Sequence, residues 1–279
     1  MNDSIPQISS AGQVCRYRLP WRFLGGFLWA ALMLRPRSFA RDAQVAVTGL
    51  RPALEVLGAE HVPPCGPCLV VCNHYSRPDF DAWWLALAIA AAVASRRAPD
   101  ADPEIHWVMT AAWTFPESRW RRRILTPLTR WAFDRVARVY GFVTMPPMPP
   151  DPDEVGARAA AVLRTVRLAR RIALDGGMVG LAPEGMDVQG RFGRLPKSVG
   201  AFIALLVEAG LPILPVGVTE QRGRLRVSFG PLFAPDVPSS RSERDRAVAQ
   251  QVMASIARQL SGECFRSSGD CACGDNEVQ

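Results

Sequence analysis

Hydrophobic positions along the 279-residue chain recur with two periods, one typical of strands and one typical of helices. Short runs that are wholly apolar, or that alternate between apolar and polar residues, predict strands at 44–50, 68–72, 105–110, 178–182, 212–219 and 224–229. Longer runs with apolar residues three and four positions apart predict helices at 79–95, 113–140, 154–174, 197–209 and 241–260. Because strands alternate with helices, the sequence predicts an α/β fold in which helices flank a mixed central sheet.

The two ends of the chain differ from its middle in composition. Residues 1–15 are polar and rich in Ser, which predicts a disordered N-terminus, and residues 262–279 predict a disordered acidic tail. Between them, residues 16–42 predict an amphipathic N-terminal helical segment, and residues 43–261 predict a folded domain.

The segment 16–42 holds twelve uncharged residues, from Phe23 to Leu34, between clusters of arginine. A helix needs about 20 apolar residues to span a bilayer, so this run is too short. We therefore expect a membrane-associating helix that lies in the interface, with Trp21 and Trp29 at the depth of the lipid headgroups. The alternative is a helix that is buried against the domain.

The composition narrows the class of protein. Hydrophobic residues make up 48% of the chain and charged residues 21%, which excludes a chain that is disordered throughout. The seven cysteines are too sparse for a disulfide framework and lack the spacing of a zinc site, so we expect them to be structural and expect no bound metal. The net charge of +7 favours an anionic partner, but Lys197 is the only lysine, which is typical of a GC-rich coding bias. The basic excess therefore says little about partners.

His74 is the histidine with a chemical context. It directly follows the apolar strand 68–72, and Asp79 follows it five residues later, at the start of a predicted helix. Loops at the ends of sheet strands are where α/β folds bind ligands. A carboxylate on one ring nitrogen would fix the tautomer, so that the other nitrogen could act as a general base. The alternative is a loop histidine that caps a helix.

Four blocks follow one another along the chain: Asn73-His74 with Asp79, Pro183-Glu184-Gly185, then 195–202 and 212–216. In this order they resemble the glycerolipid acyltransferase family, which includes the bacterial lysophosphatidate and lysophospholipid acyltransferases. The resemblance spans about 44–232. It implies a glycerol-3-phosphate/lysophosphatidate acyltransferase-like fold, and it makes 43–261 an acyltransferase domain.

The resemblance also implies the chemistry. His74 would act as general base on the hydroxyl of the acceptor, Asp79 would orient His74, and the hydroxyl would attack an acyl thioester of coenzyme A or acyl carrier protein. This implies an O-acyltransferase similar to the 1-acylglycerol-3-phosphate acyltransferases, with no cofactor besides the thioester co-substrate. The candidate substrate-binding residues lie in or beside the same blocks; they are Asn73, Arg77, Pro183, Glu184, Gly185 and Lys197.

Two positions depart from the family pattern. Met186-Asp187 stands where the family has Thr-Arg, and the block 140–145 lacks a basic residue. The resemblance assigns both missing arginines to the phosphate of the acceptor, and Asp187 would repel a phosphate. Lysophosphatidate therefore does not follow as the acceptor, and a neutral, zwitterionic or amino-acid-headed lysolipid, or a non-glycerol hydroxyl compound, fits as well.

The expected partners are a membrane surface, a lipid acceptor and acyl-CoA or acyl carrier protein, at the cytoplasmic face of the bacterial inner membrane. The stretch 113–131, rich in Trp and Arg, fits a membrane-facing helix, a patch for the donor or an ordinary amphipathic helix. We expect no nucleic acid, because no nucleic-acid motif accompanies this stretch.

Two other functions stay open: a catalytically inactive lipid-binding protein on the same scaffold, and a lipid or thioester hydrolase in which His74 activates water.

Overall fold

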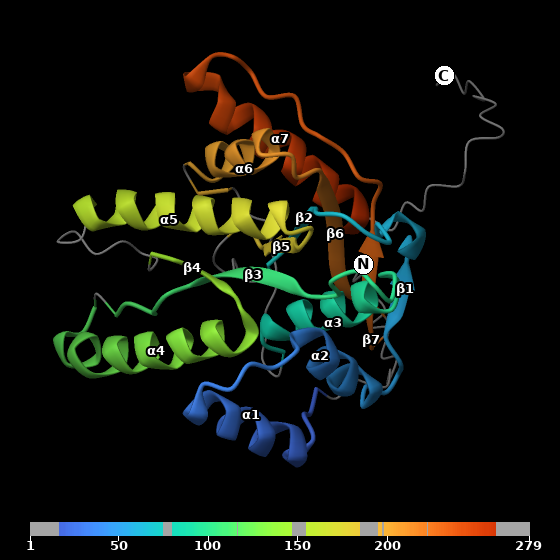
Figure 1. Ribbon diagram of the computed structural model, residues 1–279, viewed down its shortest axis with the longest axis vertical. Helices are drawn as coiled ribbons and strands as arrows, with labels where there is room; N and C mark the ends of the chain where they lie inside the picture. Colours follow the sequence, from blue (N-terminus) through green and yellow to red (C-terminus); the bar gives the residue numbers. More distant parts are fainter. Residues whose placement is uncertain are drawn as a thin grey trace, which may run out of the picture.

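The computed structural model describes residues 17–74, 80–115, 117–146, 155–184, 195–196, 198–221 and 223–260, without the side chains of 155–159 and 241 (Figure 1). The predicted disordered segments 1–15 and 262–279 lie outside the described residues.

Seven strands form one mixed sheet. They are β1 (Glu55–Leu57), β2 (Leu69–Cys72), β3 (Ile105–Thr110), β4 (Val143–Met145), β5 (Met178–Leu181), β6 (Ile213–Gln221) and β7 (Arg224–Phe229). Their order across the sheet is β1-β7-β6-β2-β5-β3-β4. Strands β2 to β6 run parallel to one another, whereas β7 is antiparallel to β6 and β1 is parallel to β7. The predicted mixed α/β sheet is confirmed.

Helices cover both faces of the sheet. They are α1 (Trp21–Met33), α2 (Phe39–Thr48), α3 (Trp83–Ala94), α4 (Arg119–Tyr140), α5 (Val155–Leu174), α6 (Val199–Glu208) and α7 (Arg241–Leu260), with a short 3-10 turn at Ala59–His61. Residues of α1 to α4 share one apolar core with the sheet, and residues of α5 to α7 share a second core on its other face (Figure 1).

The predicted strand at 44–50 is wrong, because these residues belong mainly to α2. The helix begins after Ser38, whose side chain accepts a hydrogen bond from the Arg41 N–H and so caps the first turn. Ala43, Ala46 and Leu50 then fall on one buried face at helical spacing. The apolar positions of 44–50 also alternate, and in so short a run the two periods cannot be told apart.

Two strands were not predicted, β1 and β4, and both have three residues. A run of three is too short to show a period of two, and each of these strands lies at an edge of the sheet. By contrast, β3, β7 and α7 have the predicted bounds. The helix predicted from residue 113 begins at Arg119, where the Ser118 side chain caps it, and it ends at Gly141 in the left-handed conformation with φ +66°.

The N-terminal segment 16–42 holds α1 and the start of α2, not one continuous helix. The chain turns at Leu34, and the following Arg35-Pro36 disfavours helical backbone. In α1 only Ala30 is buried, and Phe27 stacks on Tyr140 with ring centroids 5.8 Å apart. A narrow strip of α1 therefore packs on the domain, while most of the helix is exposed. Among the described residues, none of the helices has the length and apolar character required to cross a membrane.

Candidate active site

The site lies where the carboxyl ends of β2 and β5 meet, in the middle of the sheet. After β2 the chain leads to α3 on one face of the sheet, and after β5 it leads to α6 on the other face. Two neighbouring parallel strands whose loops leave toward opposite faces open a crevice between them, which is the usual ligand site of open α/β sheets. Asn73 and His74 follow β2 directly, and Pro183 and Glu184 follow β5.

Asn73 joins the end of β2 to β6. Its Nδ2 donates to the carbonyl oxygen of Val218 at 3.0 Å, and its Oδ1 accepts from the Val218 N–H at 2.8 Å. The residue is only 6% exposed. Both ends of the amide thus bind the neighbouring strand, so Asn73 fixes the position of the backbone that carries His74.

Glu184 holds the backbone of His74 from the other side. The His74 N–H donates to Glu184 Oε2 at 2.7 Å, and Glu184 is only 5% exposed. A buried carboxylate that accepts a backbone N–H makes a strong, charge-assisted hydrogen bond. The sequence prediction gave Glu184 a place in acceptor binding, and the structure adds this positioning contact, which no spacing in the sequence indicates.

His74 itself is half-buried, and its Nδ1 atom is buried in the protein. Its backbone is fixed through Glu184 on β5 and, through the adjoining Asn73, on β6. Pro183 is buried beside Glu184. The other predicted site residues, Asp79, Arg77, Gly185 and Lys197, lie outside the described residues, so their roles stay predictions.

The buried cysteines at the two ends of β2 are not poised as nucleophiles. Cys72, the last residue of β2, is buried, and burial together with the negative charge of Glu184 raises the pKa of its thiol to about 12. Burial likewise raises the pKa of Cys68 to about 12. A thiol that stays protonated at neutral pH is a poor nucleophile and a poor metal ligand. No three His, Cys, Asp or Glu side chains of the described ranges gather closely enough to hold a metal ion.

His106, near the start of β3, lies away from the site and has structural contacts. Its Nδ1 lies 2.7 Å from the Gly141 carbonyl oxygen, and its Nε2 lies 3.7 Å from Asp102 Oδ2. The interaction with Asp102 is the main cause that raises the pKa of His106, and the same pair lowers the pKa of Asp102.

This pair predicts a pH-dependent contribution to stability. Because the pKa of His106 is raised on folding, its contribution is full below the ordinary histidine value of about 6.5 and is lost as the pH rises through the raised value. We expect the melting temperature of His106→Gln to fall further below the wild type at about pH 5.5 than at about pH 8.5. Calorimetry at the two pH values measures the melting temperatures. A difference between wild type and variant that is larger at the higher pH would contradict the expectation.

A family of known proteins matches the part of the chain that holds this site. A family model described as Acyltransferase matches residues 53–219, which is more than half of the chain and includes β2, β5 and the site between them. No curated protein matches the sequence. The solved structure of the 1-acyl-sn-glycerophosphate (LPA) acyltransferase PlsC from Thermotoga maritima is similar at 19% identity and a TM-score of 0.47, over 85% of this chain and 88% of that one. The extent of the family match shows that this chain belongs to the acyltransferase family, as its ordered sequence blocks predict.

Proposed function

We propose that the protein transfers a fatty acyl group from an acyl thioester, on coenzyme A or acyl carrier protein, to a hydroxyl of a lysolipid-type acceptor. The observation that supports this proposal is the place of His74, at the carboxyl ends of β2 and β5 inside the family match, with its backbone bound by Glu184 at 2.7 Å. In this proposal His74 is the general base and Asp79 orients its ring.

The reaction needs one proton to be moved twice. His74 takes the proton of the acceptor hydroxyl while the hydroxyl oxygen attacks the carbonyl carbon of the thioester. The carbon–sulfur bond then breaks, and the leaving thiolate receives the proton from the imidazolium. The Asp79 carboxylate stabilises that imidazolium between the two steps. The products are an ester and a free thiol, with no acyl-enzyme.

The experiment that tests the proposal follows free thiol and lipid products together. Purified protein is mixed with acyl-CoA, or with acyl carrier protein that carries an acyl thioester, and with lysolipids that differ in headgroup charge. Thiol release that requires the lysolipid, with a matching diacyl product in the mass spectrum, supports acyl transfer. Free fatty acid formed without acceptor would identify a hydrolase, and binding of lysolipid without any thiol release would identify an inactive lipid-binding protein.

Membrane association is part of the same proposal, and the exposed faces of α1 and α4 support it. On α1 the exposed residues include Trp21 at 86%, Leu28 at 64% and Trp29 at 55%. On α4 they are Trp120, Ile124, Leu128 and Trp131, all at least 47% exposed, among exposed arginines at 119, 121, 122, 123 and 130. The two helices are tied together because Arg135 Nη1 donates to the carbonyl oxygens of Ala31 at 2.9 Å and Leu32 at 2.6 Å.

Together α1 and α4 expose a surface of the composition that binds lipid interfaces, with aromatic side chains for the headgroup region and arginines for lipid phosphates. By this proposal the protein is membrane-associated, at the cytoplasmic face of the bacterial inner membrane.

We expect the double variant Trp21→Ser/Trp120→Ser to bind vesicles that contain phosphatidylglycerol at least about tenfold more weakly than the wild type, because two large aromatic side chains no longer enter the interface. Co-sedimentation with the vesicles measures the loss. Leu174→Ser is the matched control, since Leu174 is 75% exposed but belongs to α5 on the other face of the sheet. Equal losses for the variant and the control would contradict the assignment of this surface.

A further inference from the structure

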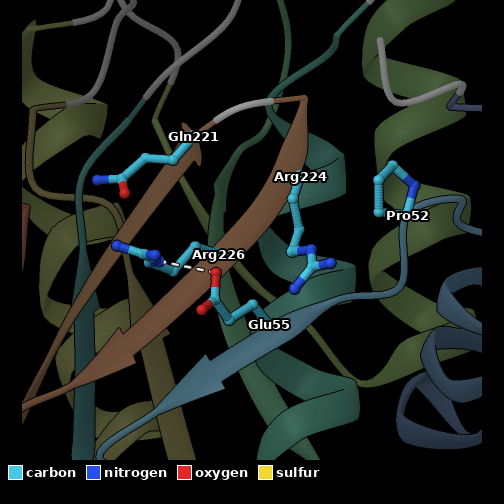
Figure 2. Close-up of a pocket in the computed structure, with 5 residues that line it drawn as sticks. All are labelled: Pro52, Glu55, Gln221, Arg224 and Arg226. Atoms are coloured by element: carbon cyan, nitrogen blue, oxygen red, sulfur yellow. Dashed lines mark hydrogen bonds and ion pairs between the residues drawn. The ribbon is translucent and has the colours of Figure 1, made fainter. Parts of the chain in front are cut away.

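A polar pocket of about 390 Å³ lies at the side of the sheet formed by β6, β7 and β1. It is lined by Pro52, Glu55, Gln221, Arg224 and Arg226 (Figure 2). The size is in the range of small-molecule sites, which is about 300–1,000 Å³. Among the described residues that line the pocket, none is aromatic and none is a large aliphatic residue, so this lining is unsuited to an acyl chain and suited to a charged, hydrogen-bonding group.

The pocket opens at the same edge of the sheet as the candidate active site. Because β7 and β1 run opposite to the other strands, their first residues lie at the edge where β2, β5 and β6 end. Arg226 pairs with Thr219 on β6, and the preceding residue of β6, Val218, is the one that binds Asn73. Strand β7 is two strands away from β2, which is a lateral distance of roughly 10 Å.

The charges in the pocket leave it with a positive excess. Arg226 Nε donates to Glu55 Oε2 at 3.0 Å, and this ion pair holds the Arg226 guanidinium in place (Figure 2). Arg224 is exposed and makes no ion pair with the residues that the structure describes. The described residues of the lining therefore carry two positive charges and one negative charge.

The two arginines point to one side of β7. Leu225, Val227 and Phe229 are buried in the core that the sheet shares with α3, so the alternating Arg224 and Arg226 face the other way. Guanidinium groups with free N–H donors bind phosphate oxygens in a planar, two-point geometry. The amide of Gln221, beside Arg226 in Figure 2, adds a further donor and acceptor.

We propose that this pocket binds the phosphate groups of the nucleotide part of an acyl-CoA donor, with Arg224 as the main contact. The proposal rests on the proposed function, since it places the donor of that reaction. Coenzyme A carries its thioester on a long flexible arm, far from its phosphates, so the nucleotide can sit in the pocket while the thioester reaches His74. The phosphate of a lysolipid is only a few bonds from the reacting hydroxyl, which makes a pocket two strands away from β2 a poor match for it.

The test compares donors and variants in the acyl-transfer assay. For Arg224→Gln we expect the KM for acyl-CoA to rise about tenfold, the loss typical of one charge-assisted hydrogen bond, while kcat and the KM for the lysolipid stay unchanged. With an acyl-pantetheine donor, which lacks the nucleotide, wild type and variant should have the same KM. Arg171→Gln is the matched control, because Arg171 is exposed on α5 and lies outside the pocket.

Each result that would contradict the proposal differs from the expected one in a measured KM. An unchanged KM for acyl-CoA, or an equal rise with acyl-pantetheine, would overturn the proposal. A rise in the KM for a phosphate-bearing lysolipid alone would assign the pocket to the acceptor headgroup, and a rise for acyl carrier protein alone would assign it to that protein. Calorimetric titration of CoA into wild type and Arg224→Gln measures the pocket without turnover. If the wild type binds CoA tightly, Arg224→Gln does not, and the wild type transfers no acyl group, then the pocket assignment stands and the proposed function is rejected.

Discussion

The His74→Ala variant should lose about 10² to 10⁴ of the wild-type kcat for acyl transfer, which is the usual contribution of a positioned general base. In the proposed mechanism the imidazole takes the proton of the attacking hydroxyl and the variant lacks it, whereas the residues proposed to bind donor and acceptor are unchanged. The KM values should therefore change little. The assay with acyl-CoA and lysolipid measures both parameters.

A matched control separates this loss from misfolding. His61→Ala removes another histidine of the same domain, one that lies in the short turn 59–61. Both variants should keep the wild-type circular dichroism spectrum, and only His74→Ala should lose turnover. Near-normal turnover of His74→Ala would reject the general base, and an equal loss in His61→Ala would show that the assay reports stability instead of catalysis.

Glu184→Ala should lower kcat by roughly 10², because the His74 backbone loses the 2.7 Å hydrogen bond that fixes it, and a displacement of about 1 Å in a reacting group can cost that much. Glu184→Gln keeps an acceptor oxygen for the His74 N–H and should retain more activity than Glu184→Ala. The order wild type, Gln, Ala is the signature of a positioning role.

A contact with the acceptor headgroup would give another pattern. If the charge of Glu184 binds substrate, Gln should be as damaging as Ala, and the main change should be in the KM for the lysolipid. Glu208→Gln is a useful control, since its carboxylate pairs with Arg244 at 3.0 Å on the face covered by α6 and α7. Parallel measurements of kcat, KM and melting temperature separate the two roles from a general loss of stability.

The core of the fold is readable from the sequence because its strands and helices are long or strongly apolar. Strand β2 is buried at all four positions, and nine of the twelve residues of the apolar helix α3 are buried. Local patterns decide such elements. The segment 44–50 gives a wrong prediction because its apolar residues satisfy both periods. That it forms a helix and not a strand depends on the capping side chain of Ser38 and on packing against α3.

The sequence predicts the position of His74 but not the contacts that hold it. His74 could be placed at the end of a strand, because the apolar run before it is unambiguous. Its bond to Glu184 joins residues 110 positions apart, and the pair Arg226–Glu55 joins residues 171 positions apart. Such contacts depend on the order of strands in the sheet, and no local pattern in the sequence reports that order.

The two anchors of the His74 region have a consequence for how the protein acquires its activity. The bonds of Asn73 to Val218 and of His74 to Glu184 form only after β6 and β5 have joined β2. Contacts between residues so distant in sequence are slow to form, because the loop between them must close first. A chain still emerging from the ribosome therefore holds His74 without its full set of supports until β6 has been made and has joined β2. Catalytic competence should thus appear late in folding, as a property of the completed sheet.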